Sequence, residues 1–219
     1  MRDEKIKKSP DDLSARSTSI RSIERVDPSE IDTVARVLST AYAEYPVHTW
    51  IMPKTTRLDD AKIFFTFYLR WLQPRSWDVF ATADRSAVIV TRPVRYGDSK
   101  YPEGLRYLPT LIRAKSPVNE FFQWVENFRP KIDHQYFEFL AALPNAHRGT
   151  GFFLLASVLE IFDRESIPVW TWTANSHILP FFRRQGFEIG TELHRDDSTP
   201  PVIPLWRQPA PLKEEDKSI

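Results

Sequence analysis

The chain has 219 residues, enough for one domain to bury its own hydrophobic core without disulfides or a structural metal. Its 30 lysines and arginines nearly balance its 29 aspartates and glutamates, so the basic excess typical of a nucleic-acid-binding protein is missing. Cysteine is absent, which excludes disulfides, thiolate nucleophiles and cysteine-ligated zinc.

The apolar runs are short, and stretches such as residues 152–156 fall far below the roughly 18 residues of a membrane span. Residues 1–19 mix acidic and basic side chains with almost no large apolar ones, which predicts a flexible tail rather than a secretory signal. We therefore expect a cytoplasmic protein with a single domain at residues 20–207 and a polar tail at residues 208–219.

The first half of the chain predicts helices around a β-hairpin. A weak strand at residues 20–26 ends at Asp27, which can cap a helix that begins at Pro28, with Glu30 placed as in a capping box. Hydrophobic periodicity and proline positions predict the next elements. These are a helix at residues 58–72, a hairpin of residues 79–83 and 87–90, and helices at residues 105–112 and 116–128.

The second half alternates strands and helices. Residues 136–143 (YFEFLAAL) are almost wholly apolar, which predicts a central strand covered on both faces. The elements predicted after it are a helix at residues 152–164, a strand at 169–174, a helix at 176–185 that ends at Gly186, and strands at 187–191 and 202–206. This order indicates the α/β class, with a central mixed β-sheet flanked by helices.

Two of the six glycines, Gly149 and Gly151, lie between the apolar strand and the helix that follows it. Missing side chains let a ligand approach the backbone, and the first N–H groups of a helix carry the positive end of its dipole. Arg148 adds a cation at the rim. The pattern predicts an anion site, and a tight turn that simply requires glycine would produce the same pattern.

The wider pattern resembles a known family. RGTG at residues 148–151, then Asn175, then GF at residues 186–187 is similar to the motif order of the GNAT acetyltransferase superfamily. AYAEYP at residues 41–46, with Trp50, resembles the opening of the puromycin N-acetyltransferase branch. The resemblance implies the GNAT-type acyl-CoA N-acyltransferase fold, with acetyl-CoA as co-substrate.

In that family the co-substrate lies where two central strands splay apart. The resemblance implies that backbone groups of Ala141, Ala142 and Leu143 pair with its pantetheine amides, and that Asn175 lies near its distal part. The pyrophosphate would be held by the N–H groups of Arg148, Gly149, Thr150, Gly151, Phe152 and Phe153.

Two positions depart from the family pattern. Phe153 replaces the last small residue of the loop motif, where its ring either packs inward or crowds the phosphates. Phe182 stands where many members carry a tyrosine that protonates the departing thiolate, and such general acid catalysis contributes about 10²- to 10⁴-fold. The alternatives to acetyl transfer are therefore a lyase, isomerase or cyclase on the same fold, or a catalytically silent binding domain.

Glu138 is the only acid within the predicted central strand. Strand alternation would place it on one face with Tyr136 and Leu140, where it either points into the cleft as a general base or forms a salt bridge. His134, just before the predicted strand, is the alternative base because of its intrinsic pKa.

Aromatic side chains are candidates for the acceptor pocket. Trp170 and Trp172 share one face of a strand, which is typical of a core and also suits a pocket wall together with Tyr136 and Trp50. No spacing of histidines or carboxylates indicates a metal site. We expect transfer of an acyl group, most simply acetyl, to the amine of a small molecule by a monomer or homodimer with no nucleic-acid or membrane partner.

Overall fold

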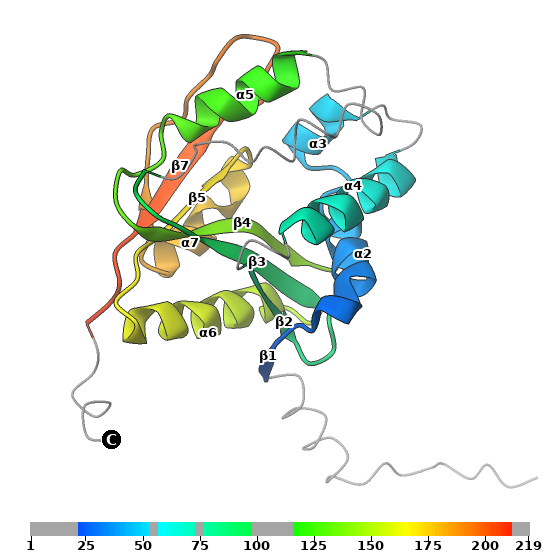
Figure 1. Ribbon diagram of the computed structural model, residues 1–219, viewed down its shortest axis with the longest axis vertical. Coiled ribbons are helices and arrows are strands. Elements are labelled where there is room, and N and C mark those ends of the chain that lie inside the picture. The colour runs from blue at the N-terminus through cyan, green and yellow to red at the C-terminus, as the bar shows by residue number, and fades with distance from the viewer. Residues whose placement is uncertain (1–21, 53–56, 73–76, 98–115, 212–219) are drawn as a thin grey trace, which may run out of the picture.

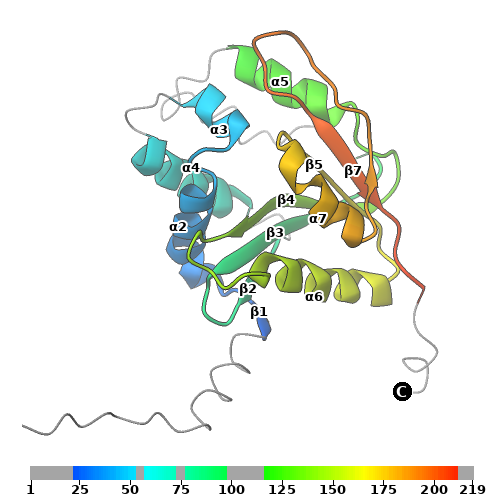
Figure 2. The same ribbon diagram turned by 180° about the vertical axis from the view of Figure 1, so that it is seen from behind.

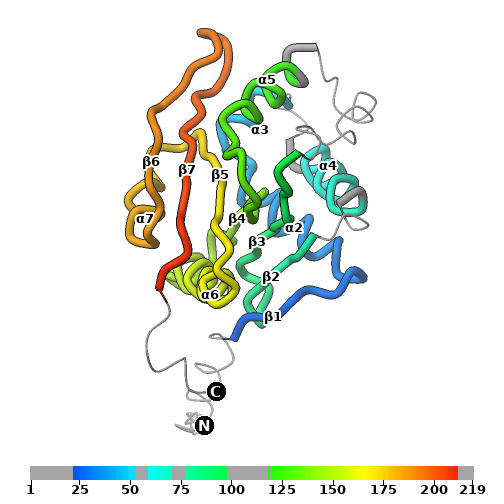
Figure 3. Tube along the Cα trace, turned by 60° about the vertical axis from the view of Figure 1, so that its left-hand side comes forward, coloured from blue at the N-terminus to red at the C-terminus, as the bar shows by residue number. Residues whose placement is uncertain are grey.

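A computed structural model describes the chain over residues 22–52, 57–72, 77–97 and 116–211. Its centre is a seven-stranded sheet with the strand order β1-β2-β3-β4-β5-β7-β6 (Figure 3). The β4–β5 pair is parallel, and the other neighbouring pairs are antiparallel. The predicted α/β class with a mixed sheet is confirmed.

The strands are β1 (Ile23–Arg25), β2 (Asp78–Thr82), β3 (Ala87–Val94), β4 (His134–Ala142), β5 (Val169–Thr173), β6 (Glu188–Ile189) and β7 (Ile203–Arg207). The helices are α2 (Ile31–Ala41), α3 (Pro46–Ile51), α4 (Arg57–Leu72), α5 (Ser116–Glu126), α6 (Thr150–Arg164) and α7 (Leu179–Arg184), with 3₁₀ turns η1 (Pro28–Glu30) and η4 (Ser176–Ile178). Within these described ranges, no helix is long and apolar enough to cross a membrane.

The predicted elements inside the described ranges are present, with ends that shift by a few residues. Helix α3 was not predicted, and it begins at Pro46, whose fixed φ suits the first position of a helix. The predicted tail at residues 1–19, the predicted helix at 105–112 and residues 212–219 lie outside the described residues.

Helices cover both faces of the sheet (Figures 1 and 2). Alternate side chains of β2 and β3 divide between two cores, as the pleat of a strand requires. Val88 and Val90 pack with α2 and α4, whereas Ala87 and Ile89 pack with α6 on the opposite face. A third cluster, which includes Phe121, lies under α5.

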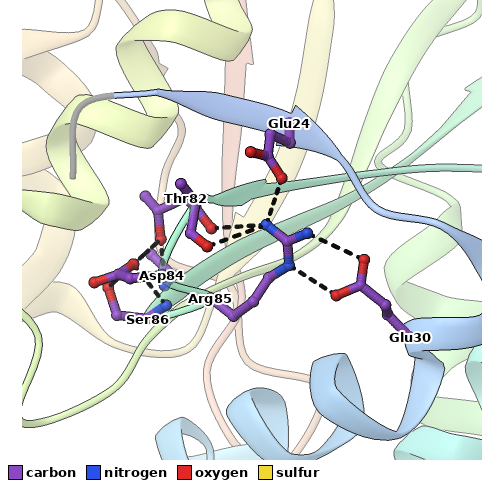
Figure 4. A network of polar contacts seen from close by, with 8 residues as sticks. Glu24, Glu30, Thr82, Asp84, Arg85 and Ser86 are labelled. Carbon is purple, nitrogen blue, oxygen red and sulfur yellow. Dashed lines mark hydrogen bonds and ion pairs between the residues drawn. The ribbon is translucent and has the colours of Figure 1, made fainter. Parts of the chain in front are cut away.

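The edge of the sheet at β1 is tied down by Arg85, in the turn between β2 and β3 (Figure 4). Asp27 caps η1 by accepting a hydrogen bond from Ser29 N at 2.8 Å. Glu30 does not complete the predicted capping box, because its carboxylate faces the guanidinium of Arg85 in a two-oxygen pair at 2.9 and 3.1 Å. Arg85 also binds Glu24 at 2.8 Å, so one side chain links the β2–β3 turn to both β1 and η1.

Candidate active site

Strands β4 and β5 pair over only two residues each and then diverge. The ladder joins Gln135 to Val169 and Tyr136 to Trp170. Beyond it, the Thr171 hydroxyl donates a hydrogen bond to the carbonyl of Phe137 at 2.9 Å. A cavity of about 220 Å³ opens between the diverging strands, and we call it the cleft cavity. It is lined by Ala41, Tyr42, Tyr45, Glu138, Leu140, Ala141, Ala142, Thr171, Trp172, Thr173, Asn175, Ile178 and Phe182.

Two tyrosines between α2 and α3 hold the diverging strands. The Tyr42 hydroxyl donates to the carbonyl of Leu140 at 3.2 Å and accepts from its N–H at 3.3 Å. The Tyr45 hydroxyl accepts from the N–H of Ala174 at 2.7 Å and lies 3.3 Å from the hydroxyl of Thr173. Burial raises the pKa of both phenols, so both remain protonated at neutral pH.

The register of β4 decides which backbone groups face the cleft. Leu143 N donates to the carbonyl of Ser86 at 2.7 Å on the β3 side, and Ala141, two residues away, faces β3 for the same reason. Leu140 and Ala142 therefore face the cleft, and Tyr42 already binds Leu140. Of the three residues predicted to pair with pantetheine, the register directs only Ala142 toward the cleft.

The loop before α6 has the geometry of an anion cradle. Gly149, with φ of +90°, is the N-cap and provides no side-chain hydrogen bond to the helix. Thr150 N is bound to the carbonyl of His147 at 3.0 Å, and Phe153 N to that of Gly149 at 2.9 Å. The N–H groups of Gly151 and Phe152 have no partner within the helix, because the first turn has no preceding carbonyls.

Gly151 lies beside the cleft-facing residue of β4. A Cβ atom added at Gly151 would meet only the Cβ of Ala142, at 3.7 Å, so the chain itself does not require glycine there. The missing side chain leaves space between the start of the helix and the splayed strand. Arg148 is exposed at the rim. These residues fit a pyrophosphate with an amide-containing arm that continues along β4.

The two phenylalanines of the loop motif do not fill the cleft cavity. Phe152 is 40% exposed and packs edge-on against Phe181, with ring centroids 5.9 Å apart. Phe153 is half-buried, and neither ring lines the cavity. Phe182 does line it, buried against Phe181 and Phe187. Residue 182 therefore presents an apolar side chain to the cleft cavity.

Asn175, predicted to lie near the distal part of the co-substrate, also lines the cleft cavity. Its side chain accepts a hydrogen bond from His177 N at 3.0 Å and so caps η4. This bond fixes the direction of the chain as it leaves β5.

Glu138 occupies a β-bulge in β4. The register shifts between Val90 and Thr91, which leaves Glu138 as the extra residue of its strand. The bulge reverses the alternation, so that Leu140 packs with the α6 core while Glu138 bonds to Tyr68 of α4. The predicted common face of Glu138 and Leu140 is therefore wrong.

The Glu138 carboxylate is held by two groups on the α4 side of the sheet. One oxygen forms an ion pair with Arg92, and the other accepts from the Tyr68 hydroxyl at 3.0 Å. Burial lowers the pKa of Arg92, but the charge of Glu138 outweighs it and raises that pKa above its usual value. Burial and the same carboxylate raise the pKa of Tyr68. The predicted salt bridge of Glu138 is present, and the residue nevertheless lines the cleft cavity.

A second cavity, of about 90 Å³, lies on the far side of Glu138, and we call it the aromatic cavity. It shares Tyr42, Tyr45, Glu138 and Trp172 with the cleft cavity. Its other lining residues are Val47, His48, Ile51, Phe64, Tyr68, Phe122, Glu126, Tyr136 and Phe139. Glu138 is the one carboxylate-bearing residue among those that line both cavities.

The predicted substrate-binding residues separate into two groups. Tyr136 and Trp172 line the aromatic cavity and are joined by a hydrogen bond of 2.9 Å from the indole N–H to the phenol oxygen. Trp170 is 1% exposed and belongs to the core under α5. Trp50 packs on Phe121 and lines neither cavity.

The histidine that lines a cavity is His48, not the predicted His134. His134 lies at the start of β4, between Trp170 and Trp206, and lines neither cavity. His48 lies in α3, lines the aromatic cavity and is only 7% exposed. No spacing in the sequence indicates His48, because α3 itself was not predicted. Among the described side chains, no three histidines or carboxylates gather into a metal site.

Comparison with known proteins identifies the fold of the chain. No family model and no curated protein sequence matches the chain. Solved structures do match. One is described as histone acetyltransferase HPA2 and related acetyltransferase from Corynebacterium glutamicum, with TM-score 0.66, 17% identity, and coverage of 88% of this chain and 98% of that one. The chain has the GNAT acetyltransferase fold.

The descriptions of two further similar structures name an enzyme activity. Mosquito arylalkylamine N-acetyltransferase-like 5b has a TM-score of 0.60 at 13% identity over 85% of this chain and 99% of that one. Drosophila melanogaster polyamine N-acetyltransferase has a TM-score of 0.58 at 15% identity over the same shares. Similarity at these identities shows the fold alone, so the activity is argued from the site.

Proposed function

We propose that this protein transfers an acetyl group from acetyl-CoA to the amine of a small molecule. The observation that carries the proposal is that Glu138 lines both cavities. One cavity opens between splayed strands beside a glycine-containing helix start, and the other is walled by aromatic rings. A thioester in the first and an amine in the second would meet at a carboxylate.

Acetyl-CoA would supply an activated thioester carbonyl. Gly151 and Phe152 offer N–H groups at the start of α6, and Ala142 offers the next cleft-facing backbone groups along β4. Asn175 and Phe182 border the same space on the β5 side. The cradle would bind the thioester and orient its carbonyl.

On the acceptor side of the reaction, Glu138 serves as the general base. The amine nitrogen forms the new C–N bond, the C–S bond breaks, and the departing thiolate takes a proton from solvent. The proton lost from nitrogen passes to Glu138, whose carboxylate keeps unused lone pairs beside those bound by Arg92 and Tyr68. The named activities of similar structures, on arylalkylamines and polyamines, support an amine acceptor.

Phe182 supports a second candidate, a different reaction in the same cleft. Its buried ring gives no proton to a departing thiolate, so an acetyltransferase would lack that acid. If acetyl transfer is the reaction, Phe182→Tyr should raise kcat by about 10²-fold, at the lower end of the range for an added general acid. Stopped-flow detection of released thiol measures it. An unchanged kcat together with undiminished acetyl-CoA binding would favour the second candidate.

Calorimetric titration of the purified protein with acetyl-CoA tests the main proposal. We expect a dissociation constant in the micromolar range and release of free thiol on addition of a primary amine. Reactions of acetyl-CoA without the protein and without the amine control for background hydrolysis of the thioester. Absence of binding at millimolar acetyl-CoA would reject the proposal.

A further inference from the structure

His48 is a buried polar side chain with an unpaired atom. It is 7% exposed, and its Nδ1 has no hydrogen-bond partner among the described residues. The side chain lines the aromatic cavity. A buried polar atom without a partner is uncommon in folded proteins and calls for an explanation such as a bound ligand or water.

Aromatic rings surround this imidazole. It stacks on Phe65, with centroids 5.0 Å apart and an interplanar angle of 16°, and it lies 5.3 Å from the ring of Tyr42 and 5.9 Å from that of Phe64. The hydroxyl of Tyr42 is engaged with Leu140, so it does not bond to the imidazole. Burial lowers the pKa of His48 to about 4, so the ring is neutral at physiological pH.

Packing alone does not account for a histidine here. Phenylalanine would stack on Phe65 equally well and would bring no unpaired nitrogen into an apolar site. His134 also has an unpaired buried nitrogen, but it lines neither cavity. His48 combines the unpaired nitrogen with an adjacent cavity, and Glu138 lines the same cavity.

We propose that His48 positions the acceptor, with its Nδ1 accepting a hydrogen bond from the N–H group of a primary amine whose apolar body lies in the aromatic cavity. The proposal rests on the proposed function and deepens it. His48 is a positioning residue for the nitrogen, and Glu138, which lines both cavities, takes the proton.

The cavity also limits the class of amine. Its volume of about 90 Å³ is well below the usual range for drug-sized ligands, so the acceptor is compact. Its two carboxylates are already paired, Glu138 with Arg92 and Glu126 with Arg129. The walls therefore favour a small monoamine with an apolar or aromatic body over a long polyamine with a second positive charge.

Two variants separate positioning from packing. His48→Phe keeps the stacked ring and removes the nitrogen, whereas His48→Asn places an amide oxygen near the former Nδ1 and removes the ring. We expect His48→Phe to raise the KM for benzylamine tenfold or more, at unchanged acetyl-CoA affinity and with an unchanged or higher melting temperature. His48→Asn should stay within about threefold of wild-type KM despite a lower melting temperature.

A purely structural role predicts the reverse order, with activity retained in His48→Phe and lost in His48→Asn. That result would overturn the proposal. Exposed His194, outside both cavities, provides the control variant His194→Phe, which should leave both Michaelis constants unchanged. Among acceptors, benzylamine and butylamine should give a higher kcat/KM than spermidine, and a preference for spermidine would contradict the proposed class.

A second measurement does not depend on acetyl transfer. In a protein labelled with ¹⁵N at histidine, benzylamine alone should shift the Nδ1 resonance of His48, assigned by its absence in His48→Phe. A shift without acetyl-CoA binding would support this site while rejecting the proposed function. Thiol release from acetyl-CoA with no shift at His48 and wild-type KM in His48→Phe would support the function and overturn this inference.

Discussion

Glu138 occupies the extra position of the bulge in β4, and the bulge decides which way its carboxylate faces. Without the extra residue, regular alternation would place it with Leu140 on the α6 side. On its actual side it meets Arg92 and Tyr68 and borders both cavities. A single irregularity in pairing therefore places the proposed base.

Replacing Glu138 by glutamine keeps its size and removes its charge. We expect kcat for amine acetylation to fall by about 10²-fold, because the proton acceptor is lost. The melting temperature should also fall, since Arg92 would keep a buried charge without a counterion. Steady-state kinetics below the transition measure kcat, and differential scanning calorimetry measures the melting temperature.

The exposed carboxylate of Glu188 gives the matched control, and Glu188→Gln should change neither value. Wild-type kcat in Glu138→Gln would contradict the assignment of the base.

His48 makes stability depend on pH. Because its pKa falls from 6.5 to about 4 on folding, only the unfolded chain takes up a proton between those values. Stability is therefore lost as the pH falls through that window, by about 2 kcal/mol at about pH 5. Urea denaturation at about pH 7 and pH 5 should show a smaller loss in His48→Phe, by about that amount. Equal losses in both proteins would contradict a neutral buried imidazole.

At the scale of elements, α6 begins where β4 opens. Gly151 lies in the first turn of α6, next to Ala142, and this placement brings the N-terminal end of the helix dipole to the splayed strand. The sequence indicates this arrangement well, because both glycines, the apolar strand and the helix are adjacent along the chain.

Gly151→Asp should separate folding from ligand binding. An acidic side chain in the first turn stabilises a helix by about 0.3 to 1 kcal/mol, so the melting temperature should stay the same or rise. Acetyl-CoA affinity should fall at least tenfold, because the new charge repels the pyrophosphate. Gly151→Asn adds similar bulk without charge and should cost less affinity. Equal affinity in Gly151→Asp and wild type would place the phosphates elsewhere.

Features that depend on neighbouring residues could be predicted from the sequence, whereas features that depend on contacts between distant residues could not. Hydrophobic periodicity over a few residues identifies most elements and the glycine loop. The bulge at Glu138 depends on pairing with β3, and the place of His48 depends on packing between α3 and α4, so neither is visible in neighbouring residues. Trp170 and Trp172 share a face as predicted, yet only depth in the fold shows that one is core and the other a cavity wall.

At the scale of the whole molecule, the sheet consists of two halves joined at a short seam. The seam between β4 and β5 has two ladder pairs, and the second half is also fixed by Arg207 of β7. Its guanidinium pairs with both oxygens of Asp163 in α6, at 2.6 and 2.8 Å, with little exposure of either side chain. This pair ties the far half of the sheet to the helix that begins at the glycine loop.

Asp163→Asn should destabilise the fold by about 3 to 5 kcal/mol, because Arg207 would remain buried with an uncompensated charge. Urea denaturation measures the loss, and the exposed residue Asp197 supplies the control variant Asp197→Asn, which should remain within about 0.5 kcal/mol of wild type. A loss as small as that of the control would show that the pair does not hold the two halves together.

Tyr42 and Tyr45 stand three positions apart in one short segment, and each holds a different strand of the cleft while lining both cavities. These two side chains therefore form a wall that the proposed thioester site and the proposed acceptor site share. Selection acting on this wall could not tune the Michaelis constants of the two substrates independently, so natural variants that accept a bulkier amine should acquire their new preference through α3, α4 or α5 instead.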